Sequence, residues 1–285
     1  MSLSAKVSDN MHQVQKLFLE VQEFMFQPHS LEEIISFLDA QPLIFRSVGY
    51  ESASFMMGMK DLEAGNEMEN LMALYKTSLL QHSFHMDIGL GWAFAKSGTL
   101  PGIFFPNRKP VMREMVFDGI GYYHGLFKGR RTVREQLVPE GIAGTDLWGF
   151  DQGLGRRLWY MAKGNVDELS LLMESFPAHR HPALWSGVGI ACGYVGGSIQ
   201  EGLELLLKYS GESKNKLQTG IILALMSRQA SGSIGQDLET ACRVICNKTT
   251  TEIEEKIGDF TKKYFYIYNS KAYSSLLTEI ESILI

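Results

Sequence analysis

Nothing constrains the fold of this chain more than a glycine-containing pattern that recurs about every 34 residues. Each copy opens with a polar residue and a glycine, most continue with an apolar residue and a second glycine, and a further glycine closes the segment. The five clear copies are DIGLGWAFAKSG (87–98), DGIGYYHGLFKG (118–129), DQGLGRRLWYMAKG (151–164), SGVGIACGYVGG (186–197) and TGIILALMSRQASG (219–232). In an earlier, degenerate copy, YESASFMMGMKDLEAG (50–65), Ser52 and Ser54 replace the two glycines.

The spacing of the copies predicts a helical-repeat protein. Successive equivalent positions lie 37, 30, 34, 34 and 33 residues apart, at Ser52, Gly89, Gly119, Gly153, Gly187 and Gly220. A unit near 34 residues is typical of two antiparallel helices joined by short turns. The first helix would carry the glycines, and the second would be the more amphipathic one, as in the segments 68–80, 165–176, 198–209 and 234–245.

We therefore predict an all-α fold of about six antiparallel helical hairpins, either an open solenoid or a closed, toroid-like ring. A single domain, 1–285, would comprise N-terminal helices (1–45), the repeat array (46–248) and a C-terminal cap (249–285). Each glycine inside a helix costs about 1 kcal/mol relative to alanine. Close approach of neighbouring helix backbones would offset that cost; alternatively, the first half of each motif is a loop.

Smaller signals refine this prediction. The pattern favours helices over 11–26 and 270–285, and Ser30 and Glu33 form a capping box before IISFL. The segment LIFRSVGYE (43–51) is compatible with a short strand, and 137–150 is the longest irregular piece. The closing glycines Gly98, Gly129, Gly164 and Gly197 suit left-handed helix C-caps.

Composition excludes several classes of function. A net charge of -5 argues against a nucleic-acid-binding protein, which needs a basic face. No apolar stretch is long enough for a membrane span, and the N-terminus lacks the apolar core of a signal peptide. Three cysteines, Cys192, Cys242 and Cys246, are too few for a disulfide framework. We expect a reduced, cytoplasmic protein with buried thiols.

Polar residues near the first glycines are the best candidates for chemistry, since no GxSxG, HExxH, CxxC or Walker motif is present. The set comprises Glu51, Asp87, Asp118, Asp151, Gln152 and Ser186. Equivalent positions of adjacent units lie near one another, so the three aspartates could share one groove and raise one another's pKa. Alternatively, each aspartate caps its own helix.

Other polar residues have both a structural and a functional interpretation. His124 could be a general acid or base or a hydrogen-bonded structural residue. Arg156 could bind an anionic substrate group or form a structural pair, with Asp151 as its nearest carboxylate in sequence. His85 and Asp87 lack further metal ligands, and His179 and His181 fit an exposed turn, so we predict no metal site.

Aromatic residues are dense around the same motifs. They include Trp92, Tyr122, Tyr123, Trp159 and Tyr194. Most are expected in the core, but several beside small-residue helix faces could wall an apolar pocket and stabilise a cation.

Several strings together resemble a bacterial family associated with enediyne polyketide biosynthesis gene clusters. They are GYESASFMMGMKD, DIGLGWAFAK, FDGIGYYHGLF, FDQGLGRRLWY and LWSGVGIACGYVGG, spread over residues 40–260. The corresponding family motifs look like GWALA, DGxGFH, DQGxGRxLWF and YSGxGLAxxYxGG. This sequence departs in having Tyr123 where Phe is usual and a shorter region after His124. The resemblance implies a role in natural-product biosynthesis and carries over the motif positions Glu51, Asp118, His124, Asp151, Gln152 and Arg156.

We therefore expect an enzyme of secondary metabolism, a cyclase or isomerase that acts on an apolar polyene-like, polyketide or isoprenoid-like substrate by acid/base chemistry. The predicted catalytic residues are Asp118, His124 and Asp151. The predicted substrate-binding residues are Glu51, Asp87, Tyr122, Tyr123, Gln152, Arg156, Trp159 and Tyr194. Nothing in the sequence requires a cofactor, and a homodimer or a partner biosynthetic enzyme is possible.

Two non-catalytic alternatives stay open at this point. A binding protein for a reactive apolar product would need the pocket but not the acids. A helical scaffold for partner enzymes would have an exposed concave surface and no closed cavity. A pocket with converging acids and histidine favours the enzyme, whereas a filled core favours the scaffold.

Overall fold

The fold is all-α, as the sequence predicts. The computed structural model describes residues 5–65, 68–78, 81–101, 112–258 and 272–284, and these contain no strand. The helices are α1 Ala5–Met25, α2 Leu31–Asp39, α3 Arg46–Ala64, α4 Glu69–Ser78, α5 Ser83–Ser97, α6 Arg113–Phe127, α7 Gly144–Met161, α8 Val166–Glu174, α9 His181–Val195, α10 Gln200–Tyr209, α11 Lys214–Ala230, α12 Gln236–Ala241, α13 Thr250–Ile257 and α15 Ala272–Ile283. The strand expected within 43–51 is wrong, because this segment begins the long helix α3.

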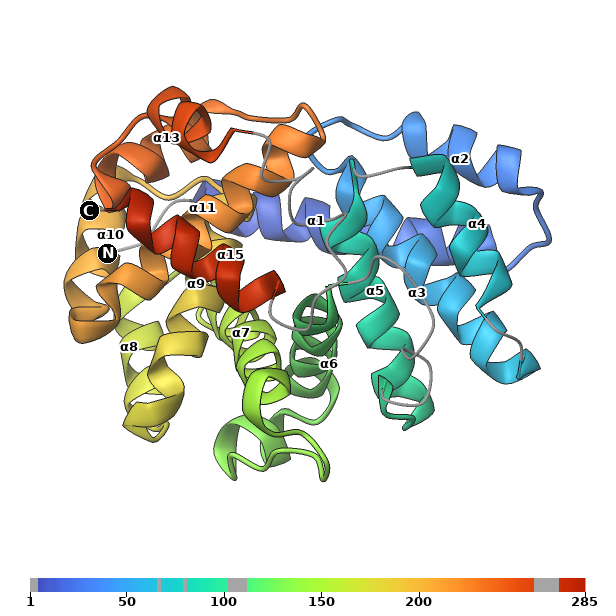
Figure 1. Cartoon of the computed structure of the whole chain (residues 1–285), viewed down its shortest axis with the longest axis horizontal. Helices are drawn as coiled ribbons and strands as arrows, with labels where there is room; N and C mark the ends of the chain where they lie inside the picture. The colour runs from blue at the N-terminus through green and yellow to red at the C-terminus, as the bar shows by residue number, and fades with distance from the viewer. Residues whose placement is uncertain (1–4, 66–67, 79–80, 102–111, 259–271, 285) are drawn as a thin grey trace.

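Six helices, α3, α5, α6, α7, α9 and α11, form a row in chain order (Figure 1). Glycines make the row tight. A Cβ placed on Gly91 would lie 2.9 Å from the Cα of Gly119, and one on Gly220 would lie 2.8 Å from the Cα of Gly189. Ordinary contact begins near 3.4 Å. The close approach that the repeated glycines predict is therefore present, with backbone packed on backbone.

The units of the row are not uniform hairpins. The amphipathic helices α4, α8, α10 and α12 follow α3, α7, α9 and α11. By contrast, α6 ends at Phe127 and is followed by Gly129, which has a right-handed φ of −54°, by the π-helical turn Arg130–Arg134 and by a loop that ends at Ala143. The left-handed C-cap predicted for Gly129 is wrong, whereas Gly98 caps α5 with a φ of 75°.

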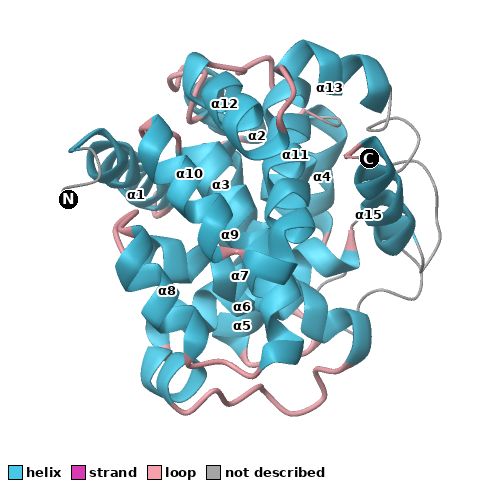
Figure 2. Cartoon of the chain, turned by 90° about the vertical axis from the view of Figure 1, so that its left-hand side faces the viewer, coloured by secondary structure: helices cyan, strands magenta, loops and turns pink. Residues whose placement is uncertain are grey.

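The helices at the two ends of the chain cover opposite faces of the row (Figure 2). α1 crosses one face and contacts α3 and α9, and α15 packs on α11 and α13 at the other face. The capping box predicted at Ser30 and Glu33 starts α2. None of the described helices is both long and apolar enough to cross a bilayer.

Each helix of the row begins several residues before its motif. α5, α6 and α7 start at Ser83, Arg113 and Gly144, so Asp87, Asp118 and Asp151 all lie inside helices. Both the N-cap interpretation of these aspartates and the loop interpretation of the motif are therefore wrong. All three carboxyl groups are buried and must find partners on other elements.

Candidate functional site

A cavity of about 500 Å³ lies between α1 and the row of helices. Its walls are mostly apolar and aromatic, with contributions from α1, α3, α5, α6, α7 and α9. Leu19 and Phe127 line it while remaining 57% and 61% exposed, so they mark its mouth. The volume falls in the range of about 300–1,000 Å³ that small-molecule sites occupy.

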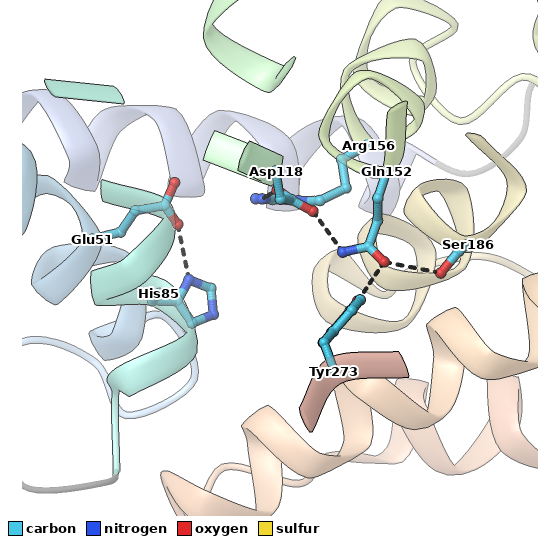
Figure 3. A network of polar contacts seen from close by, with 7 residues as sticks. All are labelled: Glu51, His85, Asp118, Gln152, Arg156, Ser186 and Tyr273. Atoms are coloured by element: carbon cyan, nitrogen blue, oxygen red, sulfur yellow. Dashed lines mark hydrogen bonds and ion pairs between the residues drawn. The ribbon is translucent and has the colours of Figure 1, made fainter. Parts of the chain in front are cut away.

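Two buried polar groups from adjacent helices meet at this cavity. The Nδ1 atom of His85, from α5, lies 2.8 Å from Oε2 of Glu51, from α3, and both side chains are buried (Figure 3). Burial lowers the pKa of His85, the bond to Glu51 opposes that shift, and Arg156 and Arg228 reinforce it. His85 is therefore neutral near pH 7. With Nδ1–H donated to Glu51, the Nε2 atom is left with a free lone pair.

Of the described cationic side chains that line this cavity, Arg156 is buried whereas Lys96 is exposed, and an ion pair holds Arg156 in place. Its Nη1 donates to Oδ1 of Asp118 at 2.5 Å, and its guanidinium lies 5.2 Å from the centroid of the Tyr122 ring. Asp118 is fully buried and does not line the cavity. Burial raises the pKa of Asp118, and Arg156 and the Gln152 amide counteract that rise.

Gln152 carries this network through the row of helices. Its Nε2 donates to Oδ2 of Asp118 at 3.0 Å. Its Oε1 accepts hydrogen bonds from the hydroxyls of Tyr273, at 2.6 Å, and Ser186, at 3.2 Å (Figure 3). Since Tyr273 belongs to α15, the Gln152 amide that orients Asp118 is itself held from the opposite face of the row.

Neutral hydrogen-bond donors complete the lining. Burial raises the pKa values of Tyr122, Tyr160 and Tyr194, so their hydroxyls stay protonated at physiological pH. The indole N–H of Trp92 is buried, and no described residue accepts a hydrogen bond from it. The guanidinium of Arg228 lies 3.9 Å from the centroid of the Tyr194 ring. The cavity thus combines aromatic walls with donors, a deep guanidinium and one carboxylate–imidazole pair.

The structure brings most, but not all, of the predicted substrate-binding residues to this cavity. Glu51, Tyr122, Tyr123, Arg156 and Tyr194 line it. Gln152 acts on it through Asp118, as described above, while the buried Asp87 and Trp159 lie outside its lining.

The three predicted catalytic residues do not converge. Asp151 pairs with Arg180, whose Nε donates to both of its carboxylate oxygens at 3.1 and 3.0 Å. The expected pairing of Arg156 with Asp151 is thus wrong, because Arg156 binds Asp118. His124 lines a separate hollow of about 190 Å³, and burial together with Lys128 and Arg131 lowers its pKa to about 4.

Asp87 also has a local explanation. Its Oδ1 accepts a hydrogen bond from the hydroxyl of Tyr75, and its Oδ2 accepts one from the backbone N–H of Met112 at 2.9 Å. The side chain therefore ties α4 and the start of α6 to α5. Burial raises the pKa of Asp87 to about 8, although both hydrogen bonds oppose the rise.

His85 is a polar cavity residue that sequence reasoning did not place among the site residues. The sequence offered it only as an isolated metal ligand, and its partner Glu51 is 34 residues away in the chain. Among the residues that the structure describes, no group of three or more His, Cys, Asp or Glu side chains could hold a metal ion. The signal that could have identified His85 is its place on the same helical face as Trp92, seven residues later.

Comparison with known proteins gives a family but no activity. No curated protein and no solved structure matches the chain. One family model, that of a protein of unknown function (DUF1702), matches residues 2–283. Nearly the whole chain is covered, and the protein belongs to the DUF1702 family.

Proposed function

We propose that this protein is an enzyme that encloses an apolar, polyene-like molecule and isomerises or cyclises it by proton transfer. One observation carries the proposal: the hydrogen-bonded Glu51–His85 pair and the Arg156 guanidinium face the same aromatic-lined cavity. Ordinary core packing would fill such a space with apolar side chains, because buried charged groups are costly.

The roles follow from the protonation states. His85 is neutral and uses Nε2 to remove a proton from a carbon next to a carbonyl or a conjugated system. Glu51 holds the ring in the required tautomer and stabilises the imidazolium that forms. The imidazolium exchanges its N–H proton with solvent and then delivers a proton to another carbon of the substrate, so that one proton leaves, one returns, and the bonds rearrange with no net change in atoms.

The developing negative charge requires donors. Arg156 would bind the oxygen that becomes an enolate, and the protonated Tyr122 and Tyr160 hydroxyls are available as further donors. Asp118 is then a positioning residue, because it contacts Arg156 and does not line the cavity. Between apolar and aromatic walls these donors act in a low dielectric, where each contributes more than it would in bulk water.

The class of substrate rests on two arguments. The walls of the cavity select an apolar, unsaturated molecule, since aromatic rings pack against flat conjugated systems. The resemblance of the motif segments to the enediyne-associated family supports a polyketide-type or isoprenoid-like intermediate of natural-product biosynthesis.

The test is conversion in deuterated water. The purified protein is incubated in D₂O with an extract of its producing strain, and metabolites are compared by mass spectrometry with those from Glu51→Gln, His85→Asn and the control His12→Asn, which alters an exposed histidine on α1. We expect a product that carries solvent deuterium with wild type and the control, reduced at least about 100-fold in the two cavity variants. A molecule that is bound and recovered unchanged would refute catalysis and indicate a binding protein.

A further inference from the structure

A second, smaller hollow lies at the C-terminal end of α6. It measures about 190 Å³ and is lined by His124, Lys128, Arg131 and Thr132, with Leu137, Val138 and Pro139 as its apolar wall. None of the described residues that line it carries a carboxylate. Three basic side chains and a hydroxyl thus surround one space in a chain whose net charge is -5.

The cations of this hollow are not used elsewhere. In the described parts of the chain, neither Lys128 nor Arg131 forms an ion pair, whereas the neighbouring Arg130 pairs with Glu135 at 3.2 Å. Lys128 and Arg131 both act to lower the pKa of His124, so their charges lie close to its ring. The helix-end carbonyls are also occupied, since Lys128 N–H donates to His124 O at 2.8 Å and Thr132 N–H to Lys128 O at 3.0 Å.

Neighbouring residues at the end of α6 line the hollow and the large cavity. Tyr123, which lines that cavity, has its ring centroid 6.2 Å from that of His124. Phe127 is exposed at the cavity mouth and directly precedes Lys128. The end of α6 therefore presents apolar side chains to one space and basic side chains to the other.

We infer that the hollow binds the phosphate group of an amphiphilic molecule whose apolar part enters the large cavity. The inference rests on the proposed function, because it names the substrate class of that site. Phosphate fits the donor set: a guanidinium and an ammonium supply charge-assisted hydrogen bonds, and the Thr132 hydroxyl can add one more. A bound phosphate also favours protonation of His124, which then becomes a further donor.

Calorimetric titration with hexyl phosphate and with 1-hexanol tests this inference. We expect the phosphate to bind at least about tenfold more tightly than the alcohol at pH 7. Lys128→Gln and Arg131→Gln should remove this gain. Arg134→Gln should keep it, because Arg134 is an exposed cation of the same π-helical turn that does not line the hollow. Equal affinity for the two probes, or an equal loss in Arg134→Gln, would overturn the inference.

Additional binding experiments identify the source of the phosphate group and distinguish a failure of this inference from a failure of the proposed function. Binding to vesicles that contain phosphatidic acid, lost in Arg131→Gln but not in Arg134→Gln, would support the site and identify a lipid headgroup as the source. Vesicle binding that both variants weaken equally would count against it and indicate a diffuse basic surface. If hexanol binds but phosphate adds nothing, only this inference fails. The apolar site of the proposed function fails instead if inorganic pyrophosphate binds while the hexyl chain adds no affinity, that is, if hexyl phosphate binds no more tightly than pyrophosphate and 1-hexanol does not bind.

Discussion

Replacing Gly153 by alanine should destabilise the protein strongly, although alanine is the better helix former. A Cβ at this position would lie 2.5 Å from the carbonyl carbon of Asp118 and 2.8 Å from its Cα. To bring that carbonyl carbon to the ordinary contact distance of 3.4 Å, α7 must move away from α6 by at least about 0.9 Å, and the carbonyl oxygen of Asp118 lies closer still. Both atoms belong to the backbone, so no side-chain rotation can relieve the clash.

The neighbouring helix α9 prevents α7 from moving away from α6. α7 is packed just as closely on α9, where a Cβ on Gly155 would lie 2.7 Å from the carbonyl carbon of Leu184. The gain in helix propensity is about 1 kcal/mol, whereas overpacking typically costs about 1–3 kcal/mol and more when backbones must separate. We expect a net loss of about 2 kcal/mol or more, or a fall in Tm of roughly 4 °C or more.

Thermal and urea denaturation of Gly153→Ala and the matched variant Gly129→Ala measure the effect. Gly129 has a helical φ of −54°, and a Cβ placed on it would have no atom within 4 Å. Its alanine variant should therefore be neutral or more stable by up to about 1 kcal/mol. Equal stability of wild type and Gly153→Ala would refute the argument that backbone contact explains the repeated glycines.

Three further outcomes test individual contacts. A brominated fatty acid should quench Trp92 in the cavity, and Trp92→Phe should remove most of that quenching; undiminished quenching would place the ligand elsewhere. Arg180→Leu leaves Asp151 buried without its cation and should lower the free energy of unfolding by about 3–5 kcal/mol in urea titrations, where a loss below about 1 kcal/mol would contradict the role of the pair. Burial raises the pKa of Asp87 to about 8 from 3.8, so its contribution to stability is complete below about pH 4 and is lost as the pH rises through 8. Wild type should therefore lose stability relative to Asp87→Asn between about pH 5 and about pH 8.5, and parallel profiles would refute the shift.

The sequence predicted the helical class and the tight packing of the row for a physical reason. Glycine inside a helix is unfavourable, so its regular recurrence requires a compensating contact, and contact between backbones is the one that glycine alone allows. The pattern could not predict that α6 lacks a second helix. Gly129 matches the closing glycines of the other copies, but the chain keeps a right-handed conformation there.

The error over the aspartates was one of helical register. Asp118, Gln152 and Ser186 each stand directly before the first glycine of their copy, and they form one connected network. Asp87 and Asp151 stand one residue earlier. A step of one residue turns a side chain by about 100° around the helix axis. These two carboxylates therefore point to other partners, although Asp87, Asp118 and Asp151 all lie near the same motif.

The same register accounts for the cavity. Counted from the first glycine of each copy, its lining residues recur four residues before and three and seven residues after, as His85, Trp92 and Lys96 do around Gly89. These offsets lie on one helical face, two turns and then one turn apart. Arg156 and Tyr160 occupy the later two offsets around Gly153, and Tyr194 occupies the last one around Gly187.

A repeat that fixes where a side chain points leaves its identity free to differ from copy to copy. At the offset of three residues, successive copies contribute Phe55, Trp92, Tyr122 and Arg156, so one geometric position supplies three aromatic walls and one cation. The regular spacing of glycines within this chain is thus a structural requirement, because it holds the helices at contact distance. Under the proposed function, the chemistry lies in positions where the copies differ and whose side chains line the cavity, as Glu51, His85 and Arg156 from three different copies do.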